Sequence, residues 1–147
     1  MMRGEPVVVL LVEDNADHAE LVRRSLGRHQ LANRLVWLDN GEAALDYLFR
    51  RGPYTDPETF PIPHVMLLDL RLPRVDGLEV LRVVKETPSL NRIPVVILST
   101  SSEDRDIARA YEGHANSYLV KPVEFDQFTR MMTDLGFYWL AWNTKPY

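Results

Sequence analysis

Residues 65–77 read VMLLDLRLPRVDG, and this stretch decides the fold. Four apolar residues are followed directly by the carboxylate of Asp69, and a turn with Pro73 then leads into a helical pattern that starts at Gly77. A short, continuous apolar run is typical of a parallel strand that is buried on both faces. Because ligands bind at the carboxyl ends of the strands in open α/β sheets, Asp69 is predicted to lie at a ligand-binding edge.

Apolar runs of the same kind occur before and after this stretch, with helical segments between them. Residues 7–12 and 94–98 are continuous and rich in β-branched residues, while the run at 35–38 is weaker and the run at 117–120 is short. Their alternation with helices predicts an α/β fold with one doubly wound, five-stranded parallel sheet and five helices. The apolar residues with helical spacing are Ala19, Val22 and Leu26; Ala44, Leu45 and Leu48; Leu78, Leu81 and Val84; Ile107, Ala110 and Tyr111; and Phe125, Phe128, Met132 and Leu135.

Five polar side chains follow four of the predicted strands: Glu13, Asp14, Asp69, Ser99 and Lys121. If these strands are neighbours, three carboxylates, a hydroxyl and an ammonium group converge at one edge of the sheet. Like charges raise each other's pKa, so three close carboxylates stay ionised only with help. A divalent cation bound through oxygen, above all Mg²⁺, is the usual remedy. A lysine and a hydroxyl that face this cation describe a site for a phosphoryl group.

The composition of the chain argues against several classes of protein. The chain has 147 residues, of which 46% are hydrophobic, as expected of a single domain with one core. The formal net charge of −4 and the lack of a basic run argue against nucleic acid as a partner. The absence of cysteine excludes a disulfide framework. The early apolar run at 7–12 is too short for a signal peptide or a membrane span, so we expect a cytoplasmic protein without a membrane partner.

Four motifs, each at a predicted strand end, resemble the receiver domain of two-component response regulators. They are VEDN at 12–15, DLRLPRVDG at 69–77, STS at 99–101 and KP at 121–122, and the resemblance covers nearly the whole chain. It implies a flavodoxin-like fold with strand order 2-1-3-4-5. The proline-rich segment 50–63, which we expect to be a long surface loop, lengthens the interval before the second motif.

The resemblance implies that Asp69 is the phosphorylation site. Its carboxylate would attack phosphorus and take a phosphoryl group from a histidine kinase as an aspartyl phosphate. Mg²⁺ or Mn²⁺ would be held by Asp14 directly, by Glu13 through water, by Asp69, and by the backbone carbonyl of Arg71. The family often carries aspartate at the position of Glu13. By an alternative interpretation, Asp14 serves only as the N-cap of the first helix, which begins near residues 14–16.

The resemblance also assigns Ser99, Lys121 and Tyr118. Lys121 would contact Asp69 before phosphorylation and the phosphoryl oxygens afterwards, and Ser99, where the family often has threonine, would donate its hydroxyl to the same group. Together with Asp69 these two residues would form the catalytic set. Ser99 and Tyr118 would form the conformational switch. The protein would be a signalling switch that assists its own phosphorylation and dephosphorylation rather than an enzyme with a separate substrate.

A second function class also phosphorylates an aspartate at a strand end. Small Mg²⁺-dependent phosphohydrolases of the haloacid-dehalogenase type form an aspartyl-phosphate intermediate. They need a general acid two residues after the nucleophile, where this chain has Arg71, and a cap domain for the substrate. No cap-sized insertion is present, so the receiver function is favoured.

The last residues suggest a partner and an assembly. We expect a single receiver domain over 1–147, with its core at 6–136, an aromatic extension of the fifth helix at 137–147, and no effector domain. With the proline-rich loop, this ending resembles the stand-alone regulators that partner bacterial phytochromes. Apolar spacings of 3 and 4 along the fifth helix predict a homodimer. The predicted interface consists of Met132, Leu135, Tyr138, Trp139 and Trp142.

Two further groups of polar residues are predicted to have no special role. The four histidines, His18, His29, His64 and His114, lack metal-ligand spacing and are expected to be surface or hydrogen-bonded polar groups. The charged segment 103–106 begins the fourth helix, and most of it is expected to be solvated.

Overall fold

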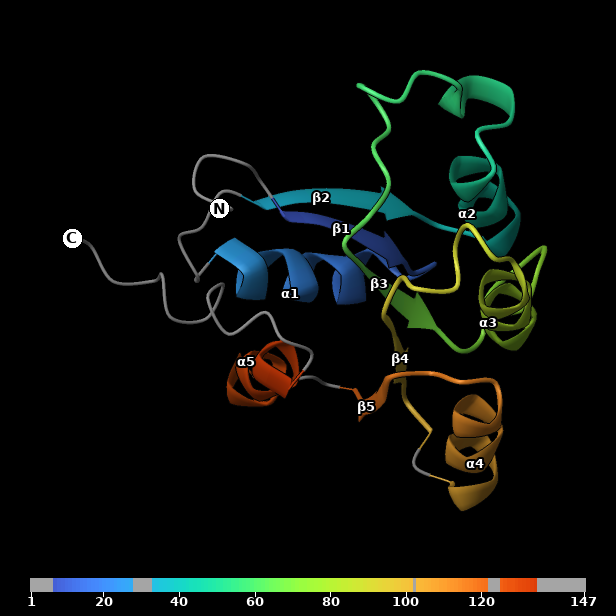
Figure 1. The fold of residues 1–147 in the computed structure, drawn as a ribbon. Coiled ribbons are helices and arrows are strands. Elements are labelled where there is room, and N and C mark those ends of the chain that lie inside the picture. Colours follow the sequence, from blue (N-terminus) through green and yellow to red (C-terminus); the bar gives the residue numbers. More distant parts are fainter. Residues whose placement is uncertain (1–6, 28–32, 102, 122–124, 135–147) are drawn as a thin grey trace.

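A five-stranded parallel sheet with the order β2-β1-β3-β4-β5 forms the centre of the molecule. The computed structural model describes residues 7–27, 33–101, 103–121 and 125–134 (Figure 1). The strands are β1 (Val7–Val12), β2 (Asn33–Leu38), β3 (Val65–Asp69), β4 (Val95–Ser99) and β5 (Ser117–Val120). The predicted fold class and strand order are therefore confirmed.

Asp69 and Ser99 are the last residues of β3 and β4, although the sequence placed them just past the strand ends. Asp69 pairs in register with Leu98, and Ser99 with Val120. The prediction was one residue short because a polar side chain ends an apolar run without ending the backbone hydrogen bonding of the strand.

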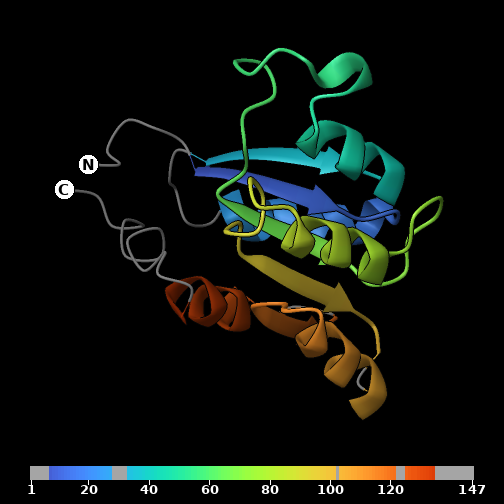
Figure 2. The ribbon, with the colours of Figure 1, turned by 45° about the vertical axis from the view of Figure 1, so that its right-hand side comes forward.

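Helices cover both faces of the sheet (Figure 2). They are α1 (Ala16–Gly27), α2 (Gly41–Leu48), α3 (Gly77–Glu86), α4 (Asp104–Glu112) and α5 (Phe125–Asp134). Residues of α1 and α5 pack with alternate residues of β1, β3 and β4 in one buried cluster, while α2, α3 and α4 contribute to a second cluster on the opposite face. Every residue of β1, β3 and β4 is buried, as the continuous apolar runs predicted.

Most of the apolar residues whose spacing marked the helices are buried or half-buried, and Tyr111 is exposed. Ala19, Leu26, Ala44 and Ala110 are buried. Tyr111, however, is 48% exposed, on a helix next to the short edge strand β5. The remaining buried positions that the spacing predicted are Val22, Leu48, Leu81 and Val84.

Met131 is the residue of α5 that the structure places in the core, and the sequence pattern did not include it. The side chains of Phe125, Phe128 and Met132, and all of residues 135–147, lie outside the described part of the chain. The side chains of the predicted dimer interface therefore also lie outside the described part of the chain.

Side-chain caps fix where the helices begin near the end of the sheet. Asn15 Oδ1 accepts hydrogen bonds from the backbone N–H groups of Asp17 (2.9 Å) and His18 (3.1 Å), which makes it the cap of α1. The alternative interpretation of Asp14 as this cap is therefore wrong. Asn40 caps α2 in the same way, by accepting from the N–H of Ala43 at 2.8 Å.

The segment 50–63 is more ordered than a surface loop without helical or strand structure. It contains the short 3₁₀ helix η1 (Gly52–Tyr54). Tyr54 and Phe60 pack against each other and against Tyr47 of α2, with ring centroids 5.1 to 5.9 Å apart. The Tyr47 hydroxyl donates to the carbonyl of Pro61 at 2.7 Å. Aromatic packing thus attaches the segment to the core, which its proline content did not reveal.

In the described ranges, no helix is both long enough and apolar enough to cross a membrane.

Candidate functional site

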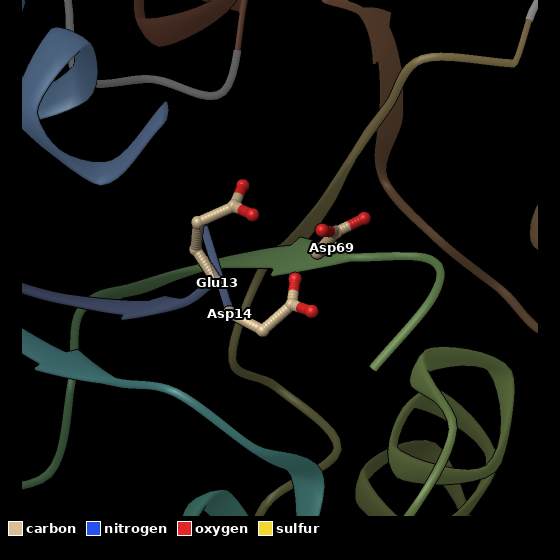
Figure 3. Close-up of side chains that lie close together, drawn as sticks. All are labelled: Glu13, Asp14 and Asp69. Carbon is tan, nitrogen blue, oxygen red and sulfur yellow. The ribbon is translucent and has the colours of Figure 1, made fainter. Parts of the chain in front are cut away.

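Three carboxylates meet at the carboxyl ends of the neighbouring strands β1 and β3 (Figure 3). Glu13 and Asp14 follow β1, and Asp69 ends β3. Val12 and Leu68 are paired in the parallel register, so the residues that follow them lie side by side. One oxygen atom of each carboxylate lies within 4.8 Å of one from each of the others. This arrangement offers hard oxygen ligands to a divalent cation such as Mg²⁺.

Lys121 brings a positive charge to this cluster from the far side of β4. It directly follows β5, and its backbone N–H donates to the carbonyl of Ser99 at 2.7 Å. The Lys121 ammonium donates to Glu13 and, at 3.2 Å, to Asp69 Oδ2. The side chain is 8% exposed, so these ion pairs are screened little by solvent. One ammonium group compensates only part of the negative charge of three carboxylates.

Glu13 and Asp14 differ in their environment. Asp14 is exposed, whereas Glu13 is completely buried. Burial raises the pKa of Glu13 to about 7, against the hydrogen bond from Lys121, which lowers it. Glu13 also accepts a hydrogen bond from the N–H of Asn15 at 3.2 Å. An exposed Asp14 beside Asp69 is accessible to a hydrated cation, while Glu13 lies deeper and holds Lys121.

The raised pKa of Glu13 gives an expected pH dependence. Between about pH 4.5 and 7 the unfolded chain has lost this proton while the folded chain retains it, so the folded state binds more protons. Without divalent cations, the contribution of Glu13 to the free energy of unfolding should therefore fall as pH rises through this window. Urea unfolding in the presence of EDTA measures it.

The control for this prediction is Glu13→Gln, which cannot titrate. Its free energy of unfolding should decline less with pH than that of the wild type over the same range. Parallel curves for the two proteins would contradict the assignment.

Arg71 and Ser99 border the cluster. The backbone N–H of Arg71 donates to Asp69 Oδ1 at 3.3 Å, so this loop stays close to the carboxylate. Ser99 is buried, and its hydroxyl oxygen accepts a hydrogen bond from the N–H of Ser101 at 3.0 Å. The hydroxyl of Tyr118 donates to the carbonyl of Ser101 at 2.9 Å. Ser99 and Tyr118 are therefore connected through the backbone of one residue.

Trp37 connects the edge strand β2 to the same site. Its indole Nε1–H donates to the backbone carbonyl of Glu13 at 2.7 Å, although the side chain is partly exposed. Trp37 also lines a cavity of about 140 Å³ with residues of α1, among them Ala16 and Arg23. The indole thus holds the segment that carries Glu13 and Asp14.

Sequence reasoning missed His18 as a member of the site. His18 Nδ1 lies 3.0 Å from Lys121 Nζ and 3.8 Å from Glu13 Oε2. His18 lies in the first turn of α1, the helix that follows Glu13 and Asp14, and this closeness in sequence was the available signal. His64, in contrast, accepts a hydrogen bond from the N–H of Val8 at 2.9 Å, which confirms the expected polar role.

Asp106 is the second residue that the sequence did not single out. It lies in the first turn of α4 and is only 2% exposed, and it is the buried exception in a segment of which most was expected to be solvated. Asp106 accepts hydrogen bonds from the hydroxyl of Ser101 and the guanidinium of Arg71. The spacing of four residues to the buried Ala110 could have indicated that it faces inward.

Comparisons with known proteins agree with this geometry. A family model described as the response regulator receiver domain matches residues 9–133. The probable methanogenesis regulatory protein FilR2 of Methanothrix harundinacea is 46% identical, over 97% of this chain and 89% of its own length. Response regulator Rcp1 of Synechocystis is 40% identical, over 96% of this chain and 94% of its own.

Two solved structures are similar over most of the chain. The Mn²⁺-bound form of response regulator Rcp1 matches with a TM-score of 0.78, covering 97% of this chain and 100% of its own. The bacteriophytochrome response regulator AtBRR is 48% identical, with a TM-score of 0.79, over 92% of this chain and 96% of its own.

Proposed function

Because the chain belongs to the response regulator receiver family, whose members are phosphorylation-based signalling switches, we propose that it accepts a phosphoryl group on Asp69 from a histidine kinase. One observation carries this proposal. Asp69, at the end of the central strand β3, has the ammonium of Lys121 at 3.2 Å and two further carboxylates beside it. A nucleophile, a cation for the phosphoryl oxygens and ligands for a metal ion are thus in one place.

The proposed reaction moves the phosphoryl group from nitrogen to oxygen. One carboxylate oxygen of Asp69 attacks phosphorus, and a new O–P bond forms as the P–N bond to the kinase imidazole breaks. The imidazole nitrogen leaves with the electron pair of that bond and takes up a proton. Lys121 stays close to Asp69 and donates to an oxygen of the transferred group, while the hydroxyl of Ser99 donates to another.

Receiver domains bind a divalent metal ion, and we propose Mg²⁺, replaceable by Mn²⁺, for this chain. The donor set fits, because the carboxylates of Glu13, Asp14 and Asp69 provide hard oxygen atoms close together. Asp14 and Asp69 would bind the ion with the backbone carbonyl of Arg71, and Glu13 through water. The ion would supply positive charge that offsets the negative charge of the phosphoryl oxygens.

Response regulators are signalling switches, and we propose that this site assists only its own phosphorylation and dephosphorylation. The alternative of a phosphohydrolase requires a general acid two residues after the nucleophile. That residue is Arg71, and arginine is not a residue type that serves as a general acid. The lack of turnover of simple phosphate esters would support the switch.

We propose a bacteriophytochrome as the kinase. AtBRR, a bacteriophytochrome response regulator, is 48% identical to this chain, which supports the proposal. FilR2, with a similar identity, is named for methanogenesis, so the test must compare kinases. Purified, autophosphorylated histidine kinases are mixed with the full chain and Mg²⁺, and phosphotransfer is timed. Transfer should be faster from a bacteriophytochrome than from unrelated kinases, and equal rates would overturn the partner assignment without affecting the site.

The switch is proposed to work through Ser99 and Tyr118. A phosphoryl group on Asp69 should draw the Ser99 hydroxyl away from Ser101 and allow Tyr118 to move, which shifts the conformations of α4. Ser99→Ala should still accept phosphate, yet hydrogen exchange at residues 104–121 should change less than in the wild type. Thr100→Ala, at the exposed neighbouring position, is the control and should respond like the wild type. An equal response of Ser99→Ala would refute this coupling.

We also propose a homodimer through Met132, Leu135, Tyr138, Trp139 and Trp142. The heptad-like spacing of the apolar residues at 125–142 supports it, as such stripes pair helices. Light scattering should give twice the monomer mass for the full chain and a lower mass for a chain that ends at Gly136. A full chain that is monomeric at high micromolar concentration would exclude the dimer.

A further inference from the structure

Asp106 is a buried carboxylate that the proposed phosphoryl transfer does not use. It lies on α4, where the hydroxyl of Ser101 donates to its Oδ2 at 2.7 Å. The Arg71 guanidinium donates to both of its oxygens, at 3.3 and 3.5 Å. The hydrogen bond from Ser101 holds the pKa of Asp106 below its usual range, against the opposite effect of burial, so the group is charged at neutral pH.

Arg71 belongs to the loop that follows the phosphorylation site. Its backbone N–H binds Asp69 Oδ1, while its side chain, 69% exposed, extends to α4. The site itself carries three carboxylates and one ammonium group. A long, flexible cation attached next to Asp69 would be attracted by this excess negative charge. The guanidinium nevertheless lies on Asp106, so Asp106 has to bind it more strongly than the three carboxylates do.

Asp106 is suited to be that partner because its carboxylate is fixed. It is 2% exposed and oriented by Ser101, so the carboxylate has little rotamer freedom left to lose when it binds the arginine. The Ser101 hydroxyl oxygen is itself bound by the N–H of Glu103 at 3.2 Å, which fixes the hydroxyl in turn.

We propose that Asp106 is a positioning residue that keeps the Arg71 guanidinium on α4 and out of the carboxylate site, so that the site stays available to the divalent cation. The inference rests on the proposed metal-dependent function. Asp106 and Ser101 would affect the affinity for the metal ion only through the position of the Arg71 guanidinium.

The test is a double-mutant cycle on Mg²⁺ affinity, measured by titration calorimetry on the full, unphosphorylated chain. Asp106→Asn should weaken Mg²⁺ binding about fivefold, because the freed guanidinium competes for the carboxylates. Arg71→Gln, which keeps the backbone carbonyl, provides the second background of the cycle: adding Asp106→Asn to it should not weaken Mg²⁺ binding further, whatever the affinity of Arg71→Gln itself. The non-additivity of the two substitutions is the decisive result.

Two further variants separate this effect from net charge and from misfolding. Ser101→Ala leaves every charge in place but removes the hydroxyl that orients Asp106, and it should weaken Mg²⁺ binding by about twofold. It also serves if Asp106→Asn does not fold, as judged by circular dichroism. Arg105→Gln removes a charge from an exposed arginine of α4 that pairs with Glu103, and it should leave the affinity unchanged.

The outcomes distinguish a failure of the proposed function from a failure of the role proposed for Asp106. If the wild type does not bind Mg²⁺, the proposed function fails. If the wild type binds Mg²⁺ but the substitutions are additive, as simple long-range charge effects would be, the role of Asp106 is refuted. Unchanged affinity in both Asp106→Asn and Ser101→Ala refutes it as well.

Discussion

Asp69→Asn is expected to reduce phosphoryl incorporation below detection. The amide has nearly the shape of the carboxylate but lacks the anionic oxygen that attacks phosphorus, and it also removes a metal ligand. The full chain is incubated with Mg²⁺ and a small acyl phosphate, and its intact mass is measured. The wild type should gain one phosphoryl group that hydroxylamine removes, as expected of an acyl phosphate.

A matched control for this result is Asp56→Asn in the segment 50–63, where the carboxylate is exposed and binds Thr59. This variant should be phosphorylated like the wild type. The same label on D69N would show that the phosphoryl group is carried elsewhere and would overturn the site.

Gly77→Ala is expected to cause a large loss of stability and of phosphorylation together. Gly77 is the first residue of α3, and its N–H donates to the carbonyl of Leu70 at 3.0 Å. A Cβ atom there would lie 2.1 Å from the carbonyl oxygen of Asp69 and 2.6 Å from that of Leu70. Both are backbone atoms and cannot rotate away. Urea unfolding should show a loss of about 3 kcal/mol, the upper part of the usual range for overpacking.

Gly27→Ala provides the comparison, since a Cβ atom at the end of α1 meets nothing within 4 Å. This substitution should be neutral or stabilise the protein by up to about 1 kcal/mol. Equal losses of stability for Gly27→Ala and Gly77→Ala would contradict the explanation that close contact with the backbone of Asp69 and Leu70 requires glycine at position 77. Phosphorylation of Gly77→Ala by the acyl phosphate should also be slower, because either α3 or the backbone that carries Asp69 has to move.

The sheet and its carboxylate cluster could be predicted because their signals are local. Continuous apolar runs mark strands that are buried on both faces, and parallel strands bring their carboxyl ends to one edge. The sequence alone therefore predicts that Glu13, Asp14 and Asp69 lie together, as they do in the structure. The strand ends were misplaced by a residue at Asp69, where backbone pairing continues beneath a polar side chain.

For His18, Asp106 and Tyr111 the sequence offers at most a weak signal, and it does not give their contacts or exposure. Each depends on how a helix is rotated and how far the neighbouring strand extends, which are tertiary properties. Asp106 lies in a run of charged residues that looks solvated, but its helix turns it toward Ser101 and Arg71. Tyr111 belongs to an apolar pattern, but it is exposed on a helix next to the short edge strand β5.

Because Trp37 donates a hydrogen bond to the backbone of Glu13, its intrinsic fluorescence can report on the site. An indole that is half in water and half against the site changes its fluorescence when the segment it binds shifts, and that segment carries Glu13 and Asp14. The chain has three tryptophans, so replacing Trp139 and Trp142 by phenylalanine would leave Trp37 as the single emitter. Cation binding and phosphoryl transfer could then be followed in real time, without a label, from the fluorescence emission of Trp37.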